Sequence, residues 1–178
     1  MKRRDPKKDG ELQQAAQDVT YEIVMLIESA CRTGATWSSP PTTPPQTERT
    51  IALESFLLHF RNLRAFLCPF IQGNPPRGDD ILASDFLGKP PQDIADASEI
   101  SSDKERLDRM LAHLSYSRAA YTWEVRKMAL AMLDQVRIFI ARLPEERKGW
   151  FPDSTVLSQG YSLISAWVPG DLISLRKE

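Results

Sequence analysis

Apolar residues recur along two long stretches of this chain with the period of an α-helix. In the first stretch they fall every three or four residues, at Leu12, Ala16, Val19, Ile23, Leu26, Ile27 and Ala30. In the second they fall at Val125, Met128, Met132, Val136, Phe139 and Leu143. This spacing places the apolar side chains on one face of a helix. The pattern therefore predicts one helix from Asp9 or Gly10 to Gly34 and another from Tyr121 to Leu143.

A third stretch, Thr47–Leu67, is apolar on most sides of a helix rather than on one face. Its apolar residues are Leu53, Phe56, Leu57, Leu58, Phe60, Leu63, Phe66 and Leu67. A helix of this kind is packed by neighbours on most sides, so the pattern predicts that it is the central helix of the fold. Thr47 is expected to cap the helix, and Pro69 is expected to end it.

Four polar side chains lie in the middle of this central helix, and a buried helix would have to satisfy them. They are Glu54, His59, Arg61 and Asn62. A short helix is expected from Asp79 to Gly88, with Ile81, Leu82 and Phe86 packed inward and an acidic cluster of Asp79, Asp80 and Asp85. Buried arginines favour carboxylate partners, and unpaired buried polar groups are costly. The sequence therefore predicts that these polar residues form a structural network.

The same residues allow a second interpretation, in which a divalent metal is bound. His59 with Asp79, Asp80 and Asp85 would supply the ligands. No spacing among them matches an established metal motif, and paired aspartates are also favoured at helix N-termini by the helix dipole. A structural ion-pair network is therefore preferred over a metal site, and no metal or other cofactor is assigned.

The remaining segments complete an all-α fold. Ser102 and Glu105 form a capping box that opens another long helix, with Leu107, Met110, Leu111 and Leu114 on its apolar face. Residues 152–178 carry too many large apolar side chains for a free tail, so an irregular segment packed on the bundle is expected, with one helical turn or a short extended pair. The prediction is a four-helix-type bundle with a short extra helix and this packing tail. Residues 1–8 are predicted to be a disordered basic arm, and residues 9–178 a single domain.

The composition and charge of the chain argue against several classes of protein. The chain has 178 residues, a net charge of −1 and 42% hydrophobic residues, which suffice for one buried core. No global basic field indicates nucleic acid, and no apolar run is long enough to span a membrane. Cys31 and Cys68 are far apart and stand in no metal-ligand spacing. With no apolar segment after the basic N-terminus, the chain is expected to be a cytoplasmic protein with reduced thiols.

A further candidate site joins Arg106 and His113. Residues seven apart lie nearly one above the other on a helix, and Arg109 lies one turn from His113. A histidine beside arginines can act as a general base or donate a hydrogen bond to a phosphate. The structural alternative is a half-exposed histidine at the flank of an amphipathic helix, and it is preferred.

An all-α bundle with Arg-x6-His on a late helix resembles the HEPN superfamily of small bacterial helical proteins. Many members are metal-independent ribonucleases of toxin and defence systems, so the resemblance implies RNA as substrate, with Arg106 and His113 in the active site. The chain departs from the family pattern at Leu107, because a polar residue usually follows the arginine. The segments HFRNLRAFL, DDILASDFL and HLSYSR also resemble a group of uncharacterised bacterial helical proteins, which implies a fold but little about function.

No other catalytic pattern is present. The chain has no glycine-rich phosphate loop, no G-x-S-x-G, no cysteine pairs for zinc and no H-E-x-x-H. The preferred interpretation is an interaction or accessory protein that pairs with a protein partner or with itself through a helix face. A HEPN-like ribonuclease, or an inactive relative, is the first alternative, and a divalent-metal-binding helical protein is the second.

Overall fold

The fold is all-α, as the apolar periodicity predicts. The computed structural model describes residues 7–34, 45–72, 75–90, 92–96, 100, 106–107, 111, 122–166 and 173–174. Its α-helices are α1 (Asp9–Gly34), α2 (Pro45–Leu67), α3 (Ala83–Phe86), α6 (Val125–Ala141), α7 (Glu145–Lys148) and α8 (Ser154–Ser165). A 3₁₀-helix, η1 (Pro69–Gln72), follows α2, and two short strands, β1 (Thr122–Trp123) and β2 (Ile173–Ser174), pair antiparallel.

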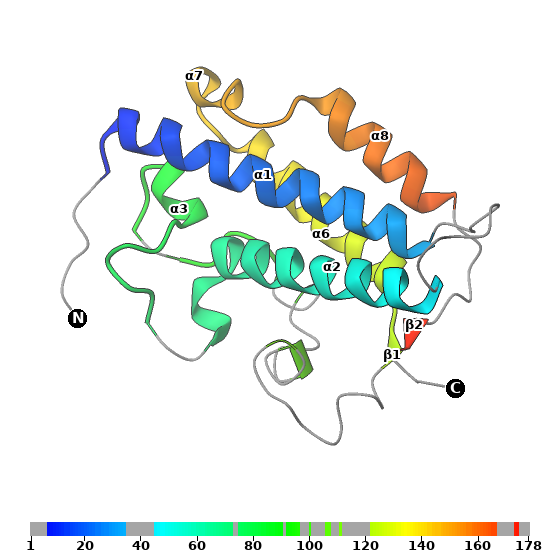
Figure 1. The fold of residues 1–178 in the computed structure, drawn as a ribbon. Helices are drawn as coiled ribbons and strands as arrows, with labels where there is room; N and C mark the ends of the chain where they lie inside the picture. Colours follow the sequence, from blue (N-terminus) through cyan, green and yellow to red (C-terminus); the bar gives the residue numbers. More distant parts are fainter. Residues whose placement is uncertain are drawn as a thin grey trace.

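The long helices form two layers (Figure 1). Helices α1 and α2 lie side by side as an antiparallel hairpin, α6 packs against the inner side of both helices, and α8 packs on α1 and α6. Helices α1 and α6 each contact the other three long helices. The hairpin therefore has one side packed on the core and one outer side directed away from it.

Helix α1 follows the predicted pattern closely. It begins at Asp9 and ends at Gly34, and its acidic first turn and basic Arg32 in its last turn suit the helix dipole. All seven residues of the predicted apolar stripe are buried or packed against the core. The stripe of the helix predicted from Tyr121 to Leu143 is likewise buried, although α6 itself is shorter and spans Val125–Ala141.

Helix α2 differs from its prediction in two respects. It begins at Pro45, two residues before the expected cap Thr47, because proline fits the first turn of a helix, where no backbone N–H is needed. It is also not covered on all sides, since Leu58 is 43% exposed and Ile51 is 60% exposed. Helix α2 is thus a hairpin helix with one open outer side, and the prediction that it is covered on most sides is met only on its inner side.

The acidic segment after α2 is mostly not helical. Helix α3 begins at Ala83 rather than at Asp79, and it has four residues. Asp85 Oδ2 accepts a hydrogen bond from the Leu82 backbone N–H at 3.2 Å, which closes the first turn of α3. Leu82 and Phe86 are buried as predicted, whereas Ile81 is 36% exposed. Gly88 ends the segment with φ of 61°, the left-handed conformation expected of it.

The C-terminal segment is more regular than predicted. The expectation of an irregular tail over 152–178 is wrong for residues 154–165, which form the 12-residue helix α8. Asp153 caps α8 by accepting a hydrogen bond from the Val156 backbone N–H at 3.0 Å. The tail also contributes an extended segment, but its Ile173 pairs with Trp123 of β1, outside the tail, rather than with another part of the tail.

Several predictions fall on residues that the structure does not describe. The basic arm is described only at Lys7 and Lys8, which precede α1. Of the helix expected after Ser102, Arg106, Leu107 and Leu111 are described, and Leu107 is buried in the core. His113 lies outside the described residues.

Aromatic side chains from four segments meet in the core. Phe66 of α2, Phe86 of α3, Phe139 of α6 and Phe151 after α7 form edge-to-face pairs with ring centroids 5.1 to 6.1 Å apart. Arg147 of α7 joins the same region from outside. It donates to the Phe86 carbonyl at 2.5 Å and to the Asp9 carboxylate at 2.6 Å. These two hydrogen bonds join α7 to α3 and to the first turn of α1. No described helix has both the length and the apolarity to cross a lipid bilayer.

Candidate functional site

One carboxylate joins the two helices of the hairpin. Glu22 of α1 accepts a hydrogen bond from His59 Nδ1 at 2.7 Å through Oε2, and from the Asn62 amide at 3.2 Å through Oε1. His59 is only 5% exposed, and the Tyr21 ring packs edge-on against it at 5.7 Å. The predicted need of His59 and Asn62 for partners is therefore met by α1. Glu22 carries no local sequence signal for this role, because it is 37 residues before His59.

The acidic cluster does not converge on His59. Asp80 accepts a hydrogen bond from the Arg77 backbone N–H at 2.6 Å, and Asp85 closes the α3 turn. Asp79 is exposed, and Glu54 and Arg61 are half-buried on α2. Among the described residues, no group of three or more histidine, cysteine, aspartate or glutamate side chains could hold a metal ion. The aspartates act in turns, and the ligand set of His59, Asp79, Asp80 and Asp85 is not assembled.

Arg106 supports the strand pair. Its guanidinium lies 4.7 Å from the centroid of the Trp123 ring and donates to the Thr122 carbonyl at 2.7 Å. Trp123 is only 1% exposed, so Arg106 covers a buried aromatic ring with a cation–π contact. Arg106 therefore contacts both residues of β1.

Neither thiol is prepared for nucleophilic chemistry. Burial, together with the nearby Asp93 carboxylate, raises the pKa of the Cys68 thiol to about 11. Burial also raises the pKa of the Cys31 thiol. Both cysteines are free, and a thiol with a raised pKa carries little of the reactive thiolate at neutral pH.

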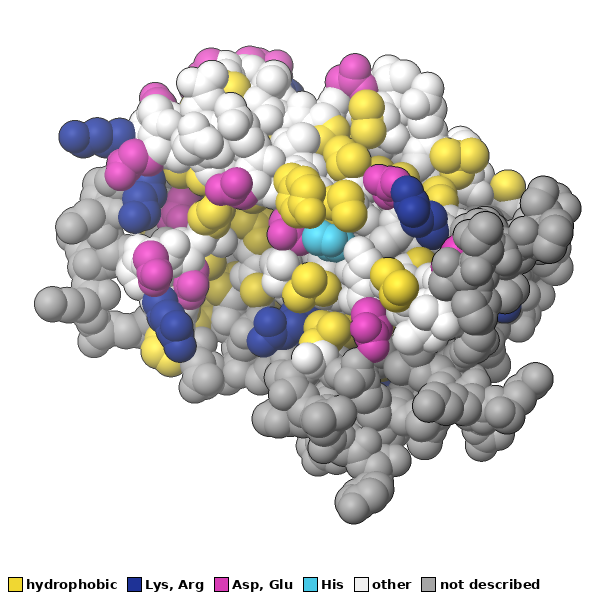
Figure 2. Space-filling view, viewed as in Figure 1, with side chains coloured by type: hydrophobic (Ala, Val, Ile, Leu, Met, Phe, Trp, Pro, Cys, Tyr) yellow, Lys and Arg dark blue, Asp and Glu magenta, His cyan; other side chains and the backbone are white. Residues whose placement is uncertain are grey.

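The outer side of the hairpin carries exposed apolar side chains. Tyr21 is 57% exposed, Ile51 60% and Leu58 43%, and these three residues are called the hairpin face. Figure 2 shows hydrophobic side chains around His59, the cyan side chain in the middle of the view. A hollow of about 470 Å³ opens at one end of this face, between Met25 of α1 and Ile51 of α2. Exposed apolar groups that gather on one side of a protein are a feature of interaction surfaces.

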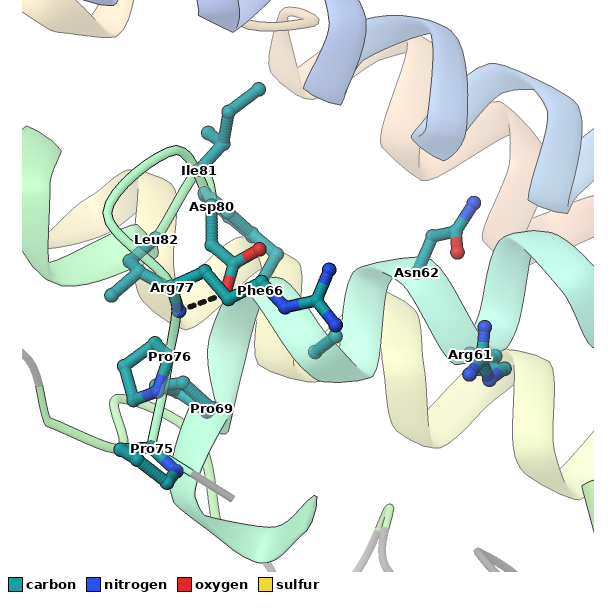
Figure 3. A pocket seen from close by; sticks show the side chains of 11 residues that line it. Arg61, Asn62, Phe66, Pro69, Pro75, Pro76, Arg77, Asp80, Ile81 and Leu82 are labelled. Atoms are coloured by element: carbon teal, nitrogen blue, oxygen red, sulfur yellow. Dashed lines mark hydrogen bonds between the residues drawn. The ribbon is translucent and has the colours of Figure 1, made fainter. Parts of the chain in front are cut away.

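A larger pocket, of about 620 Å³, lies at the other end of the hairpin, between α2 and the segment 75–82 (Figure 3). Its lining residues are Arg61, Asn62, Ala65, Phe66, Pro69, Pro75, Pro76, Arg77, Asp80, Ile81 and Leu82. The chain reaches this geometry because Pro69 ends α2, and the turn that Arg77 forms with Asp80 brings the segment back beside the helix. The lining is mixed, with the polar side chains of Arg61, Asn62, Arg77 and Asp80 beside three prolines. The sequence marks Arg61, Asn62 and Asp80 as members of a polar network, whereas no sequence signal marks Arg77 as a pocket residue.

Comparison with known proteins gives no family assignment. No family model, curated protein or solved structure matches this chain. The likeness to the HEPN superfamily therefore depends on Arg106, His113 and the helical layout. Of these, Arg106 is engaged with β1.

Proposed function

We propose that this protein is a non-enzymatic interaction protein, and that the outer side of α2 binds a second copy of the chain. The observation that carries the proposal is the exposure of Ile51 and Leu58, seven residues apart on one helix, beside exposed Tyr21 of α1. Residues seven apart recur on the same helix face. Such a face favours pairing with another helix.

The pattern of α2 fits pairing with itself. The outward residues of the helix form a single stripe, called the α2 stripe, made of Ile51, Glu54, Ser55, Leu58, Arg61, Asn62 and Ala65. Within this stripe, Ile51, Ser55, Leu58, Asn62 and Ala65 alternate by four and three residues, the spacing of a coiled-coil seam. A two-fold axis through Leu58 would place each stripe against its own copy, running in the opposite direction.

Charge complementarity supports that antiparallel arrangement. Glu54 and Arg61 flank Leu58 on the same edge of the stripe. In an antiparallel pair centred on Leu58, Glu54 of one copy faces Arg61 of the other, and two-fold symmetry repeats the contact. In a parallel pair Glu54 would instead face His59 of the other copy, and Glu54 and Arg61 would not meet. Opposite charges across an interface fix its register, whereas like charges oppose pairing.

The described polar groups give little support to catalysis. His59 is held by Glu22, Arg106 covers Trp123, and the pKa of each thiol is raised. The ribonuclease alternative needs Arg106 open to substrate beside His113. The contacts of Arg106 favour a structural role instead.

The test of self-association is the molar mass in solution, measured by light scattering over a range of protein concentrations. The wild type is expected to form dimers, and Leu58→Glu is expected to weaken them roughly thirtyfold or more, as for a central interface residue. Leu163→Glu is the matched control, because Leu163 of α8 is 61% exposed and lies outside the α2 stripe. A monomeric wild type, or equal effects of the two variants, would contradict the proposal.

The antiparallel register of the proposed dimer is tested by exchanging the charges of Glu54 and Arg61. Glu54→Arg and Arg61→Glu should each weaken the dimer about two- to tenfold, because each places like charges opposite one another. The double variant restores opposite charges and should recover the wild-type affinity. Additive weakening in the double variant would exclude the antiparallel register centred on Leu58.

Catalysis is tested with the same preparations. We expect no cleavage of RNA by the wild type in the absence of added metal. Cleavage by the wild type that is lost in His113→Ala would establish the ribonuclease alternative and overturn the non-enzymatic proposal.

A further inference from the structure

Glu22 fixes both the tautomer and the orientation of His59. The Glu22 carboxylate accepts the hydrogen bond from Nδ1 at 2.7 Å, so Nδ1 carries the proton and Nε2 keeps its lone pair. The Asn62 amide bonds to the other carboxylate oxygen at 3.2 Å, and the Tyr21 ring packs edge-on against the imidazole. Metal-binding histidines usually donate their second ring N–H in this way, because the bond holds the ligating nitrogen in place.

The second ring nitrogen of His59, Nε2, is not used within the hairpin. It has no hydrogen-bond partner in the part of the chain that the structure describes, and it is accessible to solvent although the side chain is only 7% exposed. Figure 2 shows the imidazole at the surface of the hairpin, among hydrophobic side chains. One imidazole supplies a single ligand, so a metal ion at this position needs a second one from elsewhere.

The proposed dimer supplies that second ligand. His59 follows Leu58 and flanks the α2 stripe on the edge opposite to Glu54 and Arg61. In an antiparallel pair of helices, residues that flank the seam on the same edge meet each other. With the two-fold axis through Leu58, Glu54 meets Arg61 on one edge, and His59 meets His59 of the second copy on the other edge.

We infer that His59 of the two copies binds one transition-metal ion, such as zinc, through Nε2 near the two-fold axis. Neutral imidazole nitrogens suit zinc, copper and nickel, whereas magnesium and calcium prefer oxygen ligands. The two Glu22 carboxylates behind the rings balance the charge of a divalent ion. The inference rests on the proposed antiparallel dimer, because one chain holds only half of the site.

Light scattering of the full chain in zinc chloride and in EDTA tests the site. At a zinc concentration about ten times the dissociation constant of the site, zinc should strengthen the wild-type dimer roughly tenfold. Magnesium chloride should have no effect. His59→Gln should abolish the effect of zinc. His113→Ala changes the only other histidine and is the matched control, which should respond to zinc as the wild type does.

The His113→Ala variant also leaves a single histidine for a direct measurement of binding. Nitrogen NMR of the imidazole should show a shift of the His59 Nε2 resonance when zinc is added. Glu22→Gln should weaken zinc binding about 10- to 100-fold, because the ring loses the carboxylate that orients it. Circular dichroism checks that each variant is folded.

The outcomes distinguish the metal site from the dimer. A wild-type dimer that does not respond to zinc, a zinc effect that persists in His59→Gln, or an unshifted Nε2 resonance would overturn the metal site alone. A zinc effect that is lost in Cys31→Ser would also overturn it, because the partly accessible thiol would then be the ligand. A wild type that is monomeric both with and without zinc would overturn both proposals.

Discussion

At the scale of single residues, Glu22 is a polar group that joins the two helices of the hairpin. Its two carboxylate oxygens accept from two different residues of α2, and it is itself only partly exposed, with 23% of its side chain accessible. A carboxylate that bonds to two partners in a shielded place contributes more to stability than a surface ion pair does.

Glu22→Gln should therefore lower the free energy of unfolding by about 1–3 kcal/mol, because it weakens the bond to His59 and removes an acceptor. Urea unfolding followed by circular dichroism measures the change. Glu28→Gln on the same helix is the control. Its pair with Arg32 is exposed, at 48% and 68% of the two side chains, and a change of about 0.5 kcal/mol or less is expected. Equal losses for both variants would contradict the role assigned to Glu22.

The two thiols should differ in reactivity. Burial raises the pKa of Cys68 from 9.0 to about 11, and the side chain is fully buried, whereas Cys31 is partly accessible. In single-cysteine variants, a thiol reagent should modify Cys31 faster than Cys68. The rate for Cys68 should continue to rise with pH beyond 9.0, toward 11.

The raised pKa of Cys68 also determines how the stability of the fold changes with pH. The unfolded chain releases the Cys68 proton near pH 9.0, before the folded chain does. The stabilisation is therefore complete below that pH, and it is lost as the pH rises toward 11. Cys68→Ala should remove this part of the alkaline loss of stability. An unchanged pH dependence in Cys68→Ala would contradict the assignment.

At the scale of elements, the packing of α8 on α1 depends on one glycine. A Cβ atom at Gly160 would lie 2.8 Å from Ile27 Cδ1 and 2.9 Å from Ile27 Cγ2. Ile27 is β-branched and lies in a helix, where its side chain has few alternative rotamers. The close approach of the two helices therefore requires the absence of a side chain at residue 160.

Gly160→Ala should destabilise the fold by about 1–3 kcal/mol through overpacking, which outweighs the gain of about 1 kcal/mol in helix propensity. Thermal and urea unfolding measure the change. Gly149→Ala is the control, because a Cβ there meets nothing within 4 Å. In an Ile27→Ala background, Gly160→Ala should become neutral or stabilising. Persistent destabilisation in that background would mean that the contact with Ile27 is not the cause.

The same glycine explains why α8 was not predicted. Leu157, Gly160, Tyr161 and Ile164 occupy the inward positions of α8, but a glycine at one of them hides the apolar period. Asp153 is a typical helix-capping residue, so the start of α8 does have a signal in the sequence. In α1 and α6, by contrast, the inward positions are mostly large apolar residues, so periodicity alone was sufficient.

The candidate sites could be predicted only in part, because contacts between distant segments leave no local signal in the sequence. The sequence identifies His59 and Asn62 as polar groups in an apolar helix, and hence as groups that need partners. It does not identify Glu22, because the contact depends on how α1 and α2 are placed against each other. The proximity of three aspartates in sequence favoured the wrong partner for His59. Arg77 likewise becomes a pocket residue only through the turn it forms with Asp80.

At the scale of the whole molecule, the aromatic cluster joins elements that the chain order separates. Phe139 lies within 5.1 to 6.1 Å, centroid to centroid, of the Phe66, Phe86 and Phe151 rings. Phe139→Ala should lower the free energy of unfolding by about 3–5 kcal/mol, because it leaves a cavity between α2, α3 and α6. Urea unfolding measures the loss.

Ile138→Ala provides the comparison for this cluster. Ile138 precedes Phe139 on α6, is 39% exposed and should cost about 1 kcal/mol or less. The segment after α7 should also become more accessible to protease in Phe139→Ala, because Phe151 loses a ring contact. A loss no greater than that of Ile138→Ala would contradict a central role for the cluster.

The packing of the C-terminal third on α1 has a consequence for synthesis on the ribosome. Thr20 of α1 contacts the Trp150 carbonyl, 130 residues later in the chain. At translation rates of about 5–20 residues per second, α1 and α2 emerge roughly ten seconds before the segment that covers Ile27. During that interval the nascent hairpin exposes apolar surface on its outer side and also on the surface of α1 that α8 later covers. The nascent chain is therefore most exposed to chaperones, and to premature pairing with a neighbouring nascent chain, before α8 has been made.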